Sequence, residues 1–141
     1  AAPERTMKFV PYLSFDGNCR EAFDFYAAVF GGTIKSVTTY GEMPESEKVP
    51  AELHNRIVNI QFAADDQELM GADAYFPYAA PTGITISIQI DDEARAERIF
   101  NTFAAGGTVM MPFGPTFWAR KFGIVTDRFG TPWMINCGML N

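Results

Sequence analysis

The chain has 141 residues, of which 11 are Lys or Arg and 17 are Asp or Glu, so its net charge is -6. This length allows one hydrophobic core, and an acidic chain repels the phosphate backbone of nucleic acid. No apolar run approaches the roughly 20 residues that cross a bilayer, so we expect neither nucleic acid nor membrane as a partner.

The first part of the chain begins with a predicted strand followed by a helix. Residues 7–15 have strand-like composition, although Pro11 removes one backbone donor. Asn18 is the expected N-cap of a helix whose apolar residues recur at helical spacing until Gly31 and Gly32. This pattern predicts an amphipathic helix that packs on a sheet.

Three further strands are predicted before the middle of the chain. Residues 33–40 alternate as a strand, and residues 41–55 then carry four glutamates without apolar periodicity. A stretch of this length without an element is typical of a rim or a lid. Residues 56–63 and 68–73 predict a hairpin that turns at Asp65-Asp66.

After a linker over residues 74–82, the same order of elements begins again. Residues 83–90 show the clearest period-two alternation in the chain, and Asp91 or Asp92 is the expected cap of a second helix that ends at Gly106-Gly107. Three more strands are predicted, over residues 108–111, 121–126 and 132–137.

The two halves are related in sequence. Phe15-Asp16 and Arg20 reappear 75 positions later as Ile90-Asp91 and Arg95, and the two Gly-Gly pairs keep the same offset, from 31 to 106. We therefore expect an α+β fold of two βαβββ modules, over about 8–74 and about 83–138, within one domain over 8–141 and after a flexible N-terminus over 1–7. Paired modules of this kind can enclose a cavity.

Aromatic side chains are the main candidates for the wall of this cavity. Tyr12, Phe117, Trp118 and Trp133 lie on or beside predicted strands. Trp118 follows an irregular segment of the kind in which binding residues collect, whereas packing in the core is the alternative for each of these side chains.

Two polar residues are candidates for ligand contact. His54 is the single histidine, which excludes a His-rich metal triad and leaves a general base, one metal ligand or a rim position. Arg120 lies on an otherwise apolar strand, where it would hold an anionic ligand or pair with Asp127 or a neighbouring carboxylate.

Other sequence features exclude several functions. Cys19 and Cys137 have no CxxC spacing and are expected to be small buried side chains. The chain contains no GxSxG motif, no P-loop and no GxGxxG between strand and helix. The first residues lack the pattern of a secretory leader, so we expect a cytoplasmic protein.

Three segments resemble a known family: residues 11–19 (PYLSFDGNC), 69–73 (LMGAD) and 117–136 (FWARKFGIVTDRFGTPWMIN). They are similar to the PhnB-like branch of the vicinal oxygen chelate superfamily, which includes glyoxalase I, extradiol dioxygenases and the bleomycin- and fosfomycin-resistance proteins. The similarity covers residues 8–138. It implies a glyoxalase/bleomycin resistance-like fold, with a cupped mixed sheet, two main helices outside it and frequently a homodimer.

Enzymes of this superfamily hold a divalent metal on inward-facing strands. The resemblance places the ligand positions near Val10, Asn59, Thr85 and Met134. Since a transition-metal site needs three or more His, Glu or Asp donors, this set disfavours the metal. Some members are labelled methyltransferases, but this chain has no glycine-rich loop to hold S-adenosylmethionine.

We therefore predict a cytoplasmic, homodimeric protein that binds a small organic ligand without a metal or other cofactor. Its expected contacts are the aromatic and polar candidates Tyr12, His54, Phe117, Trp118, Arg120 and Trp133. One alternative is a metal-dependent lyase, isomerase or dioxygenase that uses a displaced ligand set such as His54 with Glu52 or Asp73. Another is a degenerate member whose cavity is filled by its own side chains.

Overall fold

The computed structural model describes residues 7–75 and 77–139. The first module contains β1 (Tyr12–Phe15), α1 (Cys19–Phe30), β2 (Thr33–Thr39), β3 (Ile57–Ala64) and β4 (Gln67–Asp73). The second contains β5 (Ile86–Ile90), α2 (Glu93–Ala104), β6 (Thr108–Gly114), β7 (Ala119–Thr126) and β8 (Pro132–Met139). The predicted α+β class and the tandem βαβββ order are confirmed.

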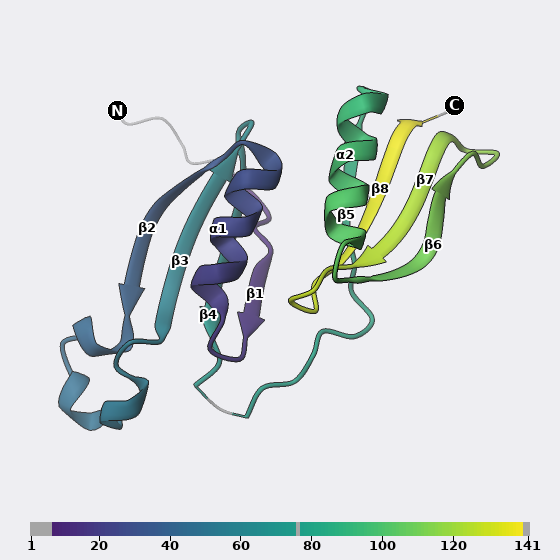
Figure 1. Ribbon diagram of the computed structural model, residues 1–141. Helices are drawn as coiled ribbons and strands as arrows, with labels where there is room; N and C mark the ends of the chain where they lie inside the picture. The colour runs from purple at the N-terminus through teal and green to yellow at the C-terminus, as the bar shows by residue number, and fades with distance from the viewer. Residues whose placement is uncertain (1–6, 76, 140–141) are drawn as a thin grey trace, which may run out of the picture.

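Each module forms its own four-stranded mixed sheet (Figure 1). The strand orders are β1-β4-β3-β2 and β5-β8-β7-β6, so the two sheets have the same topology. In each, the first strand runs parallel to the last, and the remaining pairs are antiparallel. The repeat in the sequence is therefore a repeat of one structural unit.

The ends of the helices follow from local chemistry. Gly31 ends α1 in the left-handed conformation, with φ of 70°, and its N–H donates to the carbonyl of Ala27. Asp92 caps α2 as expected, because its side chain accepts from the N–H of Arg95. The side chain of Asn18 makes no such bond, and the buried carboxylate of Asp73 instead accepts from the N–H of Cys19.

The helices lie between the two sheets (Figure 1). Phe23 of α1 packs against Phe62 of the first sheet, whereas Tyr26 of the same helix packs against Trp133 of the second. Phe103 of α2 stacks on Trp133, with ring centroids 4.9 Å apart. One hydrophobic core therefore joins both modules through the helices.

This packing turns the uncovered face of each sheet outward. Alternation along β3 places Ile60 and Phe62 in the core and Asn59 and Gln61 on the other face. The sheets are separate, so the cup expected from the resemblance is not closed within one chain.

Several boundaries differ from the sequence predictions. The first strand begins at Tyr12, after Pro11, and is shorter than expected. The glutamate-rich stretch contains three short 3-10 helices, over Tyr40–Glu42, Ser46–Lys48 and Ala51–Leu53. The predicted flexible N-terminus lies outside the described residues, except for the exposed Met7. Within residues 7–75 and 77–139, no helix has the length and apolar character needed to cross a membrane.

Candidate functional site

The uncovered face of the second sheet carries an aromatic pair. Phe122 points to this face because the next residue, Gly123, lies against Phe100 of α2 on the opposite face. The ring of Trp118 stands edge-on to Phe122, with centroids 5.1 Å apart. Trp118 is half-buried and Phe117 is 90% exposed. Phe122 is only 6% exposed, so the apolar stacking surface that this pair offers to an aromatic ligand is that of Trp118.

Polar amides lie next to this aromatic pair. Asn136 of β8 is opposite Phe122 in the sheet, and its Nδ2 donates to Oγ of Ser87 at 2.7 Å. Asn136 is buried, whereas Ser87 and Gln89 of the neighbouring β5 are exposed. The surface around Trp118 therefore offers neutral hydrogen-bonding groups.

The uncovered face of the first sheet is more polar. Tyr12 lies on it, 52% exposed, and its hydroxyl donates to the carbonyl of Val58 at 3.3 Å. Asn59 and Gln61 are neighbours on β3, with an amide contact of 3.4 Å between them. Tyr12 and Trp118 are thus on the uncovered faces of two different sheets, and one chain does not bring them to the same ligand.

Trp133 was predicted to contact a ligand, but the structure places it in the core. It is only 1% exposed and lies on the helix-covered face of β8, stacked on Phe103. Its indole N–H donates to the carboxylate of Asp127 at 2.8 Å. The sequence contained a signal for this placement. Trp133, Ile135 and Cys137 are alternate residues of the strand and therefore share one face of the sheet, whereas Asn136 lies on the other face.

Arg120 is held by the start of the second helix. Its guanidinium donates to the carbonyl of Asp91 at 2.8 Å and lies 3.8 Å from Sγ of Cys137. Within the described part of the chain it forms no ion pair, so the predicted pairing with Asp127 is wrong. Its main observed contact is with the protein backbone.

His54 organises the loop between β2 and β3. Its Nε2 lies 3.0 Å from the carbonyl of Ser46 and 2.9 Å from that of Val49. Because both partners only accept, Nε2 carries the hydrogen and is not free to bind a metal. The structure gives His54 a role in holding this loop.

Sequence reasoning missed the roles of two buried carboxylates. Asp127 is 3% exposed and accepts from the hydroxyl of Tyr26 at 2.7 Å, from Trp133 and from two backbone amides. Asp73 accepts from the amides of Cys19 and Ile57. Asp127 therefore ties the first helix to the second module, and Asp73 ties β4 to the start of that helix.

Burial and the two carboxylates raise the pKa of two neighbouring side chains. Burial, reinforced by the negative charge of Asp127, raises the pKa of Tyr26 far above its usual range. Burial, together with the nearby Asp73, likewise raises the pKa of the Cys19 thiol. Both groups stay protonated in the folded protein and are poor candidates for a nucleophile or a base.

The residues at the expected metal positions do not fit a metal. Asn59 and Met134 lie on β3 and β8, whereas Val10 and Thr85 precede β1 and β5. They offer one amide, one thioether and one hydroxyl oxygen as side-chain donors, without an imidazole or a carboxylate. Among the residues that the structure describes, no cluster of three His, Cys, Asp or Glu side chains is arranged to hold a metal.

Comparison with known proteins gives a consistent family assignment. The model of the family described as 3-demethylubiquinone-9 3-methyltransferase matches residues 7–136. Protein YjdN of Escherichia coli (strain K12) is 36% identical over an alignment length of 141. The alignment covers 92% of this chain and 95% of that protein.

Solved structures agree with this assignment. The crystal structure of protein PA1353 from Pseudomonas aeruginosa has a TM-score of 0.87 and 44% sequence identity, and the match covers 94% of this chain and 98% of that one. A putative 3-demethylubiquinone-9 3-methyltransferase, PhnB protein, from Bacillus cereus has a TM-score of 0.79, with coverage of 94% and 100%. Its 23% identity supports the fold alone.

Proposed function

Because the chain belongs to the 3-demethylubiquinone-9 3-methyltransferase family, a PhnB-like group of the vicinal oxygen chelate superfamily, we propose that it binds a small organic ligand without the usual metal of that superfamily. The ligand is aromatic or apolar on one side and carries neutral hydrogen-bonding groups on the other. Trp118, supported from below by the buried ring of Phe122, binds its apolar side.

The observation that carries this proposal is the position of Trp118. A half-buried indole on an outward-facing sheet, edge-on to Phe122, leaves aromatic surface in contact with solvent. The polar groups near it are amides and hydroxyls, from Asn136, Gln89 and Ser87. Such a combination of stacking surface and neutral donors is typical of small-molecule sites.

The site is completed, in this proposal, by a second copy of the chain. The uncovered sheet faces expose apolar side chains, with Tyr12 at 52% and Met111 at 40% of their surface, and they point outward. A homodimer that sets the Tyr12 face of one chain against the Trp118 face of the other removes both faces from water. It also encloses a cavity with one aromatic wall and one polar wall.

Methyl transfer is not part of the proposal, despite the description of the family. The connections from strand to helix are short and acidic, over residues 16–18 and 91–92, and neither is a glycine-rich loop. The metal-dependent alternative is also weakened, because Nε2 of His54 is occupied, which leaves only Nδ1 as a donor, and both Asp73 oxygens accept from backbone amides.

Binding of N-phenyl-1-naphthylamine, a neutral aromatic probe that fluoresces in apolar surroundings, tests the proposal. We expect saturable binding to the wild-type protein and a roughly tenfold weaker affinity for Trp118→Ala, since aromatic contacts and lost area together are worth about 1–2 kcal/mol. Val109→Ala is the matched control. It truncates a side chain that is 43% exposed on the edge strand β6. Val109 is paired with the core residue Val125, so it lies on the face of the sheet opposite to Trp118.

Equal affinities for wild type, Trp118→Ala and Val109→Ala would exclude Trp118 from the site. A tightly held transition metal in freshly purified protein, at one ion per chain, would overturn the metal-free part of the proposal. The cytoplasmic location stays a prediction.

A further inference from the structure

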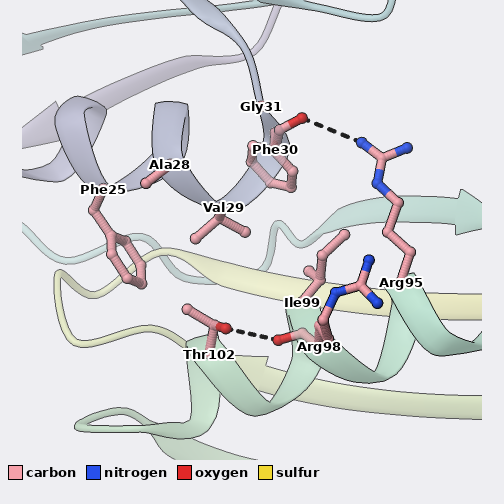
Figure 2. Close-up of a pocket in the computed structure, with 9 residues that line it drawn as sticks. All are labelled: Phe25, Ala28, Val29, Phe30, Gly31, Arg95, Arg98, Ile99 and Thr102. Atoms are coloured by element: carbon pink, nitrogen blue, oxygen red, sulfur yellow. Dashed lines mark hydrogen bonds between the residues drawn. The ribbon is translucent and has the colours of Figure 1, made fainter.

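A concave site lies between the two helices, away from Trp118. The groove has a volume of about 480 Å³ and is formed by the last turns of α1 and the middle of α2 (Figure 2). Roughly 300–1,000 Å³ is the range of small-molecule pockets, so the groove is large enough for an organic ligand.

The two sides of this groove have different chemistry. The side from α1 is apolar, with Phe25, Ala28 and Val29, and Ile99 of α2 continues this surface (Figure 2). The other side carries the guanidinium groups of Arg95 and Arg98. The lining contains no acidic side chain, although the chain as a whole has a net charge of -6.

The two arginines have different roles. Arg95 donates to the carboxylate of Asp65 at 3.3 Å and to the carbonyl of Phe30 at 3.2 Å, so it is held in place at the end of α1. Arg98 is exposed, and no described carboxylate lies within ion-pair distance of it. Its charge is available to a ligand.

The hydrogen-bonding groups of the groove also favour an anion at Arg98. Thr102 Oγ1 already donates to the carbonyl of Arg98 at 2.7 Å, and the carbonyl of Phe30 already accepts from Arg95 (Figure 2). A third guanidinium, that of Arg128, lies over the ring of Phe25 at 4.4 Å and adds positive charge at the far end. The free hydrogen-bond donors of the groove are therefore those of its guanidinium groups, which favour an anion.

We propose that the groove between α1 and α2 binds an amphipathic monocarboxylate, such as a medium-chain fatty acid. The carboxylate pairs with Arg98, in the bidentate geometry that guanidinium groups favour, and the apolar chain lies along Val29, Ile99 and Phe25. The inference is independent of the site at Trp118, because the two sites share no residue.

Titration of the full-length protein with octanoate tests this site. We expect calorimetry to give one site, and Arg98→Gln to weaken it about tenfold, as the loss of a charge-assisted bond predicts. Arg20→Gln is the matched control, because it makes the same change of charge on the outer part of α1, where Arg20 pairs with Asp24. This control should change the affinity by less than about twofold.

The position of binding is read from amide chemical shifts. Octanoate should move the signals of Ala28, Val29 and Ile99. Acetate, which lacks the apolar chain, and 1-octanol, which lacks the carboxylate, should both bind far more weakly. Trp118→Ala should leave octanoate binding unchanged. The proposal is overturned by absence of binding, by equal affinities of the Arg98→Gln and wild-type proteins, or by shifts confined to the uncovered sheet faces.

Discussion

Tyr26 shows how one residue joins the two halves of the molecule. Its side chain is fully buried, and its hydroxyl donates to Asp127 at 2.7 Å and lies 2.9 Å from Oγ of Thr131. Tyr26 is one of the residues that recur at helical spacing in the first helix, but its partner lies 101 residues away. Local periodicity predicts that such a side chain is buried and does not predict which distant group it meets.

Tyr26→Phe should destabilise the fold by about 1–3 kcal/mol, the range for a lost bond to a buried charged partner. Tyr12→Phe is the control, since the Tyr12 hydroxyl is exposed and makes a longer contact of 3.3 Å. We expect it to change the free energy of unfolding by less than about 0.5 kcal/mol. Urea unfolding of both variants measures these values, and equal stabilities would contradict this role of Tyr26.

The Tyr26→Phe variant should also change how the free energy of unfolding depends on pH. The pKa of Tyr26 is raised by folding, so its contribution to stability is complete below the ordinary tyrosine pKa of about 10. Above that pH the unfolded chain loses the proton while the folded chain keeps it, and stability falls. Urea unfolding at alkaline pH should therefore show a shallower decline for Tyr26→Phe than for wild type.

At the scale of elements, glycines on the strands allow the helices to lie close to the sheets. A Cβ on Gly71 would lie 2.7 Å from the ring of Phe23, and a Cβ on Gly123 would lie 2.6 Å from the ring of Phe100. Each helix thus places an aromatic ring over a glycine of its sheet. The repeat in the sequence predicted the helices and strands, but these contacts join residues that have no fixed offset between the modules.

Gly123→Ala should destabilise the protein by about 1–3 kcal/mol, because the added methyl group forces Phe100 or the backbone at Phe113 to move. Gly114→Ala is the matched control on β6, where an added Cβ meets no atom within 4 Å. Thermal unfolding of the two variants measures the difference. A Gly123→Ala variant as stable as Gly114→Ala would contradict the close packing of α2.

At the scale of the whole molecule, the sequence predicted the modules better than their arrangement. The offset of 75 residues and the alternation over 83–90 were sufficient for the fold class, since each module depends on local patterns. The outward direction of the open faces depends on contacts between modules, such as Tyr26 with Trp133, and no local pattern encodes them. Of the predicted ligand contacts, Trp118, Phe117 and Tyr12 remain candidates.

We propose at this scale that the ligand site is shared between two chains. Tyr12 and Trp118 lie on the uncovered faces of two different sheets, so a ligand that touches both must lie between copies of the protein. Variants Tyr12→Ala and Trp118→Ala should each bind N-phenyl-1-naphthylamine weakly when purified alone. Each homodimer would lack one of the two walls at both of its sites.

Mixing these two variants, after dissociation and reassembly, tests the claim most directly. A mixed dimer contains one site with both Tyr12 and Trp118 and one site with neither, so random reassembly should restore about a quarter of the wild-type binding capacity. Probe titration, fitted as the number of sites that keep wild-type affinity, measures this capacity. Recovery near that value is the predicted result, and a mixture that binds no more probe than the separate variants would contradict a site shared between chains.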